Sequence, residues 1–228
     1  MFAEIHDVHL WSDLPLGVTA GFTNKAYRGV AVEDDIGAIA GKLGISCEWV
    51  AWMKQVHADG LVTDMPGSAY PQEADALMTS HKNVFLVVKT ADCVPVFLID
   101  KKRRALGMVH AGRKSAGLGL VPKTISAMGQ SYGVVQEDLT VCIGPCIRAH
   151  NYEVKADVYD DPIFAQHCRV HEGKTVLDLA SLLHAQLRVA GVRDVRDCGI
   201  CTFDSVDGLY SYRRGDGDHR ILSFAVMC

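Results

Sequence analysis

Val84-Phe85-Leu86-Val87-Val88 is followed, after a short polar stretch, by a second apolar run, Val94-Pro95-Val96-Phe97-Leu98-Ile99. Short runs rich in β-branched residues predict buried strands. The second run closes in the charged turn 100–104, and Ala105–Val109 then predicts a strand that returns alongside it. We therefore expect the middle of the chain to form a strand-rich core.

Helical patterns lie on both sides of this core. The first covers Val32–Leu43, with acidic residues in its first turn and Gly44 at its end. After a glycine-rich loop over 111–119, Pro122 predicts the first turn of a second helix that runs to about Tyr132. The clearest pattern begins at the N-cap residue Asp178 and ends near Gly191.

Three further strands are predicted, over Leu139–Ile143, Leu209–Arg213 and Ile221–Met227, the last two around the turn 215–218. Strands and helices are mixed without a strict alternation, which favours an α+β fold over a doubly wound one. Neither a linker nor a repeat interrupts the sequence, so we expect a single domain over residues 1–228.

Composition excludes several classes of function. The chain has 228 residues, of which 49% are hydrophobic, and a formal net charge of −4. Nucleic-acid binding needs a dense field of cations, which this balance does not provide. Val84–Val88 is the longest uninterrupted aliphatic or aromatic run, far shorter than a membrane helix of roughly 18 residues. We expect neither nucleic acid nor membrane as a partner.

The beginning of the sequence, Met1–Asp7, is acidic and lacks the basic and apolar regions of a signal peptide. This predicts a cytoplasmic protein, in which the eight cysteines are thiols. Cys198 and Cys201 form a Cys-x-x-Cys pair without a second pair to complete a zinc cluster, so a structural role is favoured for both. Most of the cysteines are expected to be small packing residues.

Three residues carry the strongest chemical signal: His57, Cys93 and His110. Cys93 lies between the two apolar runs and His110 at the end of the returning strand, so neighbouring strands can bring them together. One thiolate and two imidazoles are ligands that Zn²⁺ accepts, with a fourth position left open for chemistry. Their spacing matches no compact metal motif, and two histidines with ordinary partners beside a core cysteine is an equal interpretation from spacing alone.

A series of motifs changes that balance. In chain order they are Lys54-Gln55-Val56-His57, Glu73-Ala74-Asp75-Ala76-Leu77-Met78-Thr79, Thr90-Ala91-Asp92-Cys93-Val94-Pro95-Val96, Val109-His110-Ala111-Gly112, Ile143-Gly144-Pro145-Cys146-Ile147, Tyr152-Glu153-Val154, and Cys201-Thr202 with Tyr210-Ser211-Tyr212-Arg213-Arg214. Together they resemble the YfiH family, also called the laccase-domain or multicopper polyphenol oxidase family, which includes the mammalian protein FAMIN. The resemblance covers about residues 20–228.

The resemblance implies a single layered α/β/β/α domain with mixed sheets flanked by helices. It also implies a zinc site at His57, Cys93 and His110, and purine nucleoside chemistry: phosphorolysis of adenosine, inosine, guanosine and methylthioadenosine, and deamination of adenosine. The expected partners are therefore purine nucleosides, with phosphate as co-substrate. The oligomeric state is left open.

Phosphate needs cations, and the candidates are Lys25, Arg113, Lys114, Arg213 and Arg214. The chain departs from the family pattern at two of them. Lys25 stands where the family usually has arginine, and Arg113 stands where it usually has tryptophan. For each of these cations taken alone, a solvated surface charge is the simpler interpretation.

Asp75 and Asp92 flank the three expected ligands in the motifs. Each carboxylate is expected either to orient a ligand histidine or bind the ribose hydroxyls, or to cap a turn.

Two other functional classes stay open. His57, Cys93 and His110 with Met108 as a weak axial ligand would make a copper site, as in a laccase-like polyphenol oxidase. Against it, the sequence lacks the His-x-His pairs that hold several coppers. A metal-free hydrolase with Cys93 as nucleophile and His57 or His110 as base is the other class.

Overall fold

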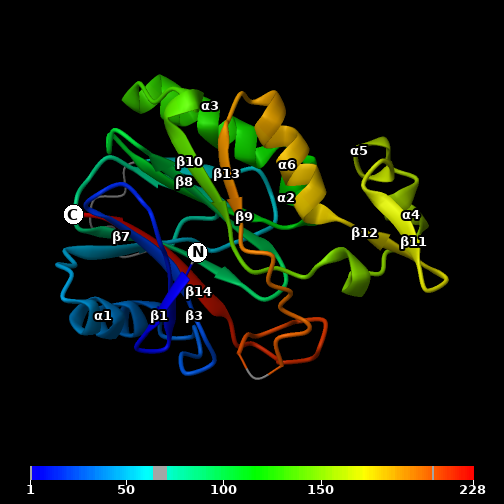
Figure 1. The fold of residues 1–228 in the computed structure, drawn as a ribbon, viewed down its shortest axis with the longest axis horizontal. Helices are drawn as coiled ribbons and strands as arrows, with labels where there is room; N and C mark the ends of the chain where they lie inside the picture. Colours follow the sequence, from blue (N-terminus) through cyan, green and yellow to red (C-terminus); the bar gives the residue numbers. More distant parts are fainter. Residues whose placement is uncertain (1, 64–70, 207) are drawn as a thin grey trace.

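Two six-stranded sheets form the centre of the molecule in a computed structural model that describes residues 2–63, 71–206 and 208–228 (Figure 1). The first sheet has the order β1-β2-β3-β14-β7-β4 and the second the order β13-β10-β8-β9-β6-β5. Both sheets mix parallel and antiparallel pairs, as β4 with β7 and β10 with β13 are parallel. A small antiparallel pair, β11 and β12, extends at one end with two short helices.

The strands of the first sheet are β1 (Phe2–Ile5), β2 (Val8–Trp11), β3 (Val18–Thr23), β4 (Trp49–Trp52), β7 (Val84–Thr90) and β14 (Ile221–Met227). Those of the second sheet are β5 (Leu61–Thr63), β6 (Ala76–Thr79), β8 (Val94–Asp100), β9 (Leu106–Ala111), β10 (Leu139–Ile143) and β13 (Asp194–Asp197). The small pair is β11 (Cys168–His171) and β12 (Lys174–Leu177). The α-helices are α1 (Val32–Leu43), α2 (Arg113–Gly117), α3 (Leu120–Tyr132), α4 (Ala156–Tyr159), α5 (Pro162–Ala165) and α6 (Leu179–Val189).

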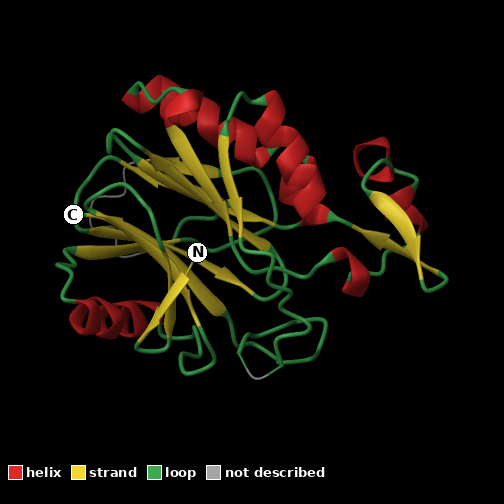
Figure 2. Ribbon diagram, viewed as in Figure 1, coloured by secondary structure: helices red, strands yellow, loops and turns green. Residues whose placement is uncertain are grey.

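The layers follow from the alternation of side chains along the strands. In β8, Val96 and Leu98 pack under the helices of the second sheet, whereas Phe97 points into the core between the two sheets. In β7, Leu86 faces that same inter-sheet core, and Phe85 packs against α1. Figure 2 shows the result, with α1 on one side of the paired sheets and α3 and α6 on the other. The predicted α+β domain with layers in the order α/β/β/α is therefore confirmed.

The segment Val84–Ile99 joins the two sheets. Its first run is β7 of the first sheet and its second run is β8 of the second sheet. Ala91, Asp92 and Cys93 therefore form the crossing between the sheets. β9 returns antiparallel to β8, as predicted.

Several predicted boundaries agree with the structure. α1 covers the predicted residues, and Gly44 ends it in the left-handed conformation (φ 66°). The carboxylate of Asp178 accepts a hydrogen bond from the backbone N–H of Ser181 (2.9 Å) and so caps α6. Leu139–Ile143 and Ile221–Met227 are strands with the predicted bounds.

Two predictions are wrong. Leu209–Arg213 is not a strand, because the Arg214 guanidinium binds the carbonyls of Leu209 and Thr202 and holds this segment in turns. The predicted loop 111–119 contains the short helix α2. Pro122 lies in the first turn of α3, which ends at Tyr132, as predicted. Within the described residues, no helix has the length and apolar character needed to cross a membrane.

Candidate active site

His57, Cys93 and His110 lie together where the two sheets meet. His57 is in the segment after β4 of the first sheet, and Cys93 is in the crossing from β7 to β8. His110 is in β9 of the second sheet, on the face that carries Leu106 and Met108 into the inter-sheet core. Both sheets therefore contribute to the group.

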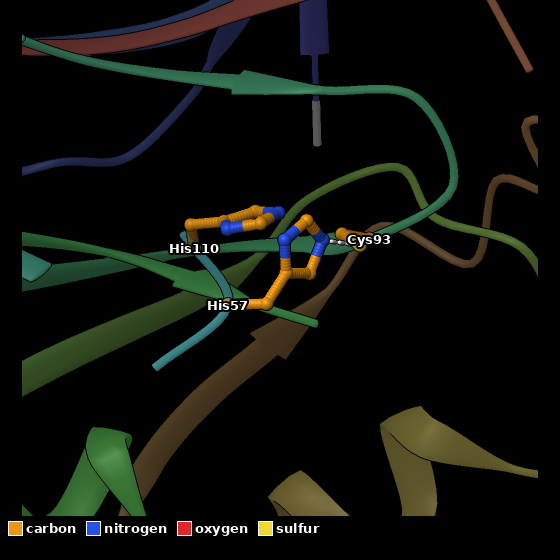
Figure 3. Close-up of side chains that lie close together, drawn as sticks. All are labelled: His57, Cys93 and His110. Carbon is orange, nitrogen blue, oxygen red and sulfur yellow. Dashed lines mark hydrogen bonds between the residues drawn. The ribbon is translucent and has the colours of Figure 1, made fainter. Parts of the chain in front are cut away.

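The three side chains converge (Figure 3). The Cys93 Sγ lies 3.8 Å from the His57 Nε2, and the rings of His57 and His110 meet edge to face with 4.7 Å between their centroids. One ligand atom from each residue falls within 4.8 Å of the others. His57 is exposed and Cys93 half-buried, whereas the His110 side chain is only 3% exposed.

Asp75 positions both histidines. Its Oδ1 lies 2.7 Å from the His110 Nδ1, which directs the other ring nitrogen of His110 away from the carboxylate. Its Oδ2 accepts hydrogen bonds from the backbone N–H groups of Val56 (3.2 Å) and Ala58 (2.7 Å), on either side of His57. A buried carboxylate that holds the far side of a ligand imidazole is the usual support of a metal site. Of the three roles expected for Asp75, the orienting one agrees with this geometry.

The electrostatics favour an ionised thiol. Burial alone would raise the pKa of Cys93, but hydrogen bonds and charge from His110 and then His57 bring it down to about 6. Burial lowers the pKa of His110, and the stronger opposing effect of Asp75 and Cys93 raises it to about 9. A thiolate beside an imidazole is both a nucleophile and a metal ligand.

Close packing shapes the backbone around this group. A Cβ placed on Gly112 would lie 2.8 Å from the His57 Cδ2 and 3.1 Å from the Cys93 Sγ, so any larger residue would have to displace these side chains. His57 (φ 59°) and Asp92 (φ 89°) both adopt the left-handed region, which is costly for residues with a side chain. Such strain is typical of functional sites.

A cleft of about 750 Å³ opens on one side of the three residues. It is lined by His57, Cys93 and His110 together with Trp52, Lys54, Gln55, Pro71, Lys89, Ala91, Tyr212 and Arg220. The Lys89 ammonium lies over the Trp52 ring, 4.5 Å from its centroid, and the Gln55 amide binds both backbone groups of Lys89. The volume is that of a site for a small molecule.

A second, smaller cavity of about 120 Å³ reaches Cys93 from another side. Arg113 and Arg213 line it together with Tyr152, and the Arg213 guanidinium lies 5.0 Å from the centroid of the Tyr152 ring. Among the described residues, no carboxylate lies within ion-pair distance of either arginine. This cavity is therefore suited to an anion.

Asp92 is 7% exposed and holds the segment that contains Thr202 and Arg213 against the site. Its carboxylate accepts hydrogen bonds from the Thr202 hydroxyl (2.6 Å) and from the backbone N–H of Arg213 (2.7 Å). These bonds fix the position of Arg213 beside the small cavity. Asp92 therefore acts on the loop here; contact with a ribose stays a prediction.

Lys25 and Arg214, which were predicted to bind substrate, have partners elsewhere. The Lys25 ammonium donates to the Val206 carbonyl (2.5 Å) and lies 3.5 Å from the Asp216 carboxylate. Arg214 also pairs with Asp216 and binds the backbone of its own loop. Their role in substrate binding stays a prediction.

Several residues that line the cavities carry no distinctive signal in the sequence. Trp52 and Lys89 stand a few residues before His57 and Cys93, and Arg220 follows the Tyr212–Arg214 motif. Tyr152 belongs to the motif Tyr152-Glu153-Val154, which marks the segment but does not indicate a role for this side chain. Only the fold shows that Trp52, Lys89 and Arg220 face the large cleft and that Tyr152 faces the small cavity.

Comparison with known proteins identifies the family and supports the fold. Residues 23–227 match the family model described as multi-copper polyphenol oxidoreductase laccase. A purine nucleoside phosphorylase of Streptomyces coelicolor is 34% identical over 220 residues, which cover 91% of this chain and 90% of that protein. A purine nucleoside phosphorylase of Mycobacterium tuberculosis is 32% identical over 222 residues, covering 92% and 88%.

A solved structure shares the whole architecture. The crystal structure of the hypothetical protein YfiH of Bacillus licheniformis superposes with a TM-score of 0.88 at 24% identity and covers 100% of this chain and 99% of its own. With the family model and the sequence relatives, this establishes that the chain belongs to the laccase-like polyphenol oxidoreductase family that includes YfiH.

Proposed function

We propose that this chain is a zinc-dependent purine nucleoside phosphorylase that also deaminates adenosine. The observation that carries the proposal is the position of Cys93, which borders both the nucleoside-sized cleft and the small arginine-lined cavity. A phosphorylase must bring a nucleoside and a phosphate ion to one point. The relatives named purine nucleoside phosphorylase support the same activity. The proposed substrates are adenosine, inosine, guanosine and methylthioadenosine.

The three residues fit zinc. Zinc takes thiolate and imidazole ligands at distances that place neighbouring ligand atoms about 3.5 Å apart in a tetrahedral site. The 3.8 Å between the Cys93 Sγ and the His57 Nε2 is close to this, and Asp75 leaves His110 Nε2 as the ligand atom. When bound, zinc supplies Lewis-acid chemistry to the group of the substrate that faces it.

Arg113, Arg213 and Tyr152 would hold phosphate. Two guanidinium groups match the geometry of a phosphate ion, and burial raises the pKa of Tyr152, which keeps its hydroxyl protonated as a donor. In phosphorolysis a phosphate oxygen forms a bond to the ribose C1′ while the bond from C1′ to the purine nitrogen breaks. The electron pair goes to the purine, which leaves with a proton.

The large cleft would hold the nucleoside. Trp52 and Tyr212 offer aromatic surface for a purine, and the polar groups of Gln55 and Lys89 lie on the same wall. In deamination a water oxygen forms a bond to C6 of adenosine and the bond to the amino group breaks, which releases ammonia and inosine. Deamination needs no phosphate, so the two activities can be measured separately.

The test is a panel of purine nucleosides, with and without phosphate, analysed by mass spectrometry. Wild-type protein should yield free purine and ribose 1-phosphate only when phosphate is present. Cys93→Ala should lose more than about 100-fold in both activities, together with its bound zinc, because it removes the thiolate ligand. Cys228→Ala, at an exposed thiol, is the matched control and should keep both. Full turnover by Cys93→Ala would show that the site is assigned wrongly.

Two other functions have an observation in their favour. The description of the family model names a laccase, and the lowered pKa of Cys93 beside His57 suits a cysteine hydrolase. The copper alternative takes Met108 as a weak axial ligand. Met108 is fully buried and packs in the inter-sheet core, so its sulfur would have to reach the copper from within that core. Metal analysis separates the three: about one zinc per site supports our proposal, copper supports the oxidase, and a metal-free enzyme that alkylation inactivates supports the hydrolase.

A further inference from the structure

A second group of mixed metal-ligating side chains lies outside the active site. His150 comes from the 3₁₀ turn Ala149–Asn151, and Cys201 and Asp204 come from the turn region after β13. One ligand atom from each of these three residues lies within 4.8 Å of the other two, as in the group at His57, Cys93 and His110. The proposed phosphorolysis uses none of them.

The geometry brings a nitrogen, an oxygen and a sulfur to one point. The His150 Nε2 lies 2.7 Å from the Asp204 Oδ2. Cys201 is 8% exposed, whereas the side chains of His150 and Asp204 are 44% and 56% exposed. The sulfur therefore forms the floor of the group, and the two other ligand atoms are open to an ion that arrives from solvent.

Neighbouring N–H groups position two of these ligands. The Cys201 Sγ accepts hydrogen bonds from the backbone N–H of Arg148 and from the Asn151 amide, each at 3.4 Å. The same amide donates to the Asp204 Oδ1 at 2.7 Å. Donors of this kind hold metal ligands in place. They also leave the Asp204 Oδ2 as the atom that faces His150.

The backbone holds the two segments together independently of these side chains. Cys146 and Cys201 form a parallel bridge, and the backbone N–H of Thr202 donates to the Cys146 carbonyl (3.0 Å). The Ser205 N–H donates to the Cys201 carbonyl (3.2 Å), which folds Asp204 back over the cysteine. The ligands are therefore preorganised.

We propose that His150, Cys201 and Asp204 form a second zinc site, distinct from the one at Cys93. One thiolate, one imidazole and one carboxylate are all zinc ligands, and the two negative charges balance the charge of Zn²⁺. On binding, the sulfur–zinc bond replaces the sulfur–hydrogen bond, and the proton passes to solvent. The Asp204 Oδ2 and the His150 Nε2 exchange their mutual contact for bonds to the ion, and water takes the fourth position.

Such an ion would join the turn at 149–151 to the loop that begins at Cys201. The next residue of that loop, Thr202, donates to the Asp92 carboxylate beside Cys93. The proposed role is therefore structural: the ion would stabilise the loop that carries Arg213 to the small cavity.

The test is the zinc content of purified protein that has been stripped with a chelator, reloaded with Zn²⁺ alone and dialysed. Wild-type protein should hold two zinc ions per chain. Cys93→Ser, Cys201→Ser and His150→Gln should each hold one, and Cys93→Ser/Cys201→Ser should hold none. Cys198→Ser is the matched control, because Cys198 lies in the same segment but outside the group, and it should hold two.

Cobalt assigns the second ion to its thiolate. Co²⁺ bound to Cys93→Ser protein should show a sulfur-to-cobalt charge-transfer band, which Cys93→Ser/Cys201→Ser should lack. A band that is absent from Cys93→Ser, or two zinc ions retained by both Cys201→Ser and His150→Gln, would overturn the proposal. Circular dichroism checks the fold of each variant. If Cys201→Ser does not fold, the zinc content of His150→Gln, which changes an exposed residue, tests the second site instead. These results do not depend on turnover of any nucleoside.

Discussion

At the scale of the residue, Gly112 decides how closely the active-site side chains approach one another. An added Cβ would lie 2.8 Å from the His57 ring and 3.1 Å from the Cys93 sulfur. Gly112→Ala should therefore push these two ligands apart and reduce both zinc affinity and phosphorolysis by about 10–100-fold, as loss of ligand orientation does elsewhere. Metal competition titration and kcat/KM measure the two effects.

Gly37→Ala is the matched control. Gly37 lies in α1, and a Cβ there meets nothing within 4 Å. The same change should leave zinc and activity intact and raise the free energy of unfolding by up to about 1 kcal/mol, since alanine is the better helix former. If Gly112→Ala also kept full affinity and activity, the site would be less tightly packed than the structure shows.

At the scale of the element, Asp100 anchors the end of β8. Its carboxylate is fully buried and pairs with the Arg104 guanidinium at 2.7 Å. Burial raises the pKa of Asp100, but the hydrogen bonds and charge of Arg104 outweigh it and hold the pKa below its usual range. The stability that this group contributes is thus present above its unfolded pKa of about 3.9 and is lost as the pH falls through the lower folded value.

Asp100→Asn should therefore lower the free energy of unfolding by about 1–3 kcal/mol at pH 7. The difference from wild type should shrink as the pH falls below about 4, because Asp100 takes up its proton there in the unfolded chain but only at lower pH in the folded protein. Urea unfolding at a series of pH values measures this. Asp59→Asn, which removes an exposed pair with Lys123, should leave stability almost unchanged. A constant difference between Asp100→Asn and wild type at every pH would contradict the assignment.

The sequence predicted elements well where local pattern and local caps agree. α1 with Gly44 and α6 with Asp178 have both, and their bounds agree with the structure. Leu209–Arg213 shows why pattern alone fails. Leu209 and Tyr210 are buried, as in a strand, but the side chain of Arg214 binds the carbonyls of Leu209 and Phe203 and holds the segment in turns. Hydrogen bonds from a side chain to the backbone produce no hydrophobic periodicity in the sequence.

At the scale of the whole molecule, we expect the two sheets to unfold together as one domain. β7 and β8 are consecutive strands of different sheets, and Leu86 and Phe97 share the inter-sheet core. All three tryptophans belong to the first sheet, whereas α3 and α6 cover the second. Tryptophan fluorescence and far-ultraviolet circular dichroism should therefore give coincident urea transitions. Separate midpoints would indicate two domains.

The same layering explains what the sequence could not predict about the site. Ordered motifs single out His57, Cys93 and His110 as candidate metal ligands, whereas their spacing alone matches no metal pattern. Their convergence depends on the stacking of the two sheets and on Asp75, whose carboxylate reaches both His110 and the segment around His57. The cleft residues Trp52 and Arg220 come from segments that only the folded first sheet brings together.

The position of β14 has a consequence for how the protein is made. Residues 221–227 form a strand in the middle of the first sheet, between β3 and β7, although the three residues of the candidate site precede them in the chain. A nascent chain on the ribosome therefore carries His57, Cys93 and His110 long before it can align them. Turnover should appear only after β14 has left the exit tunnel. Truncated mRNAs that end before the codons of β14 should yield inactive polypeptide.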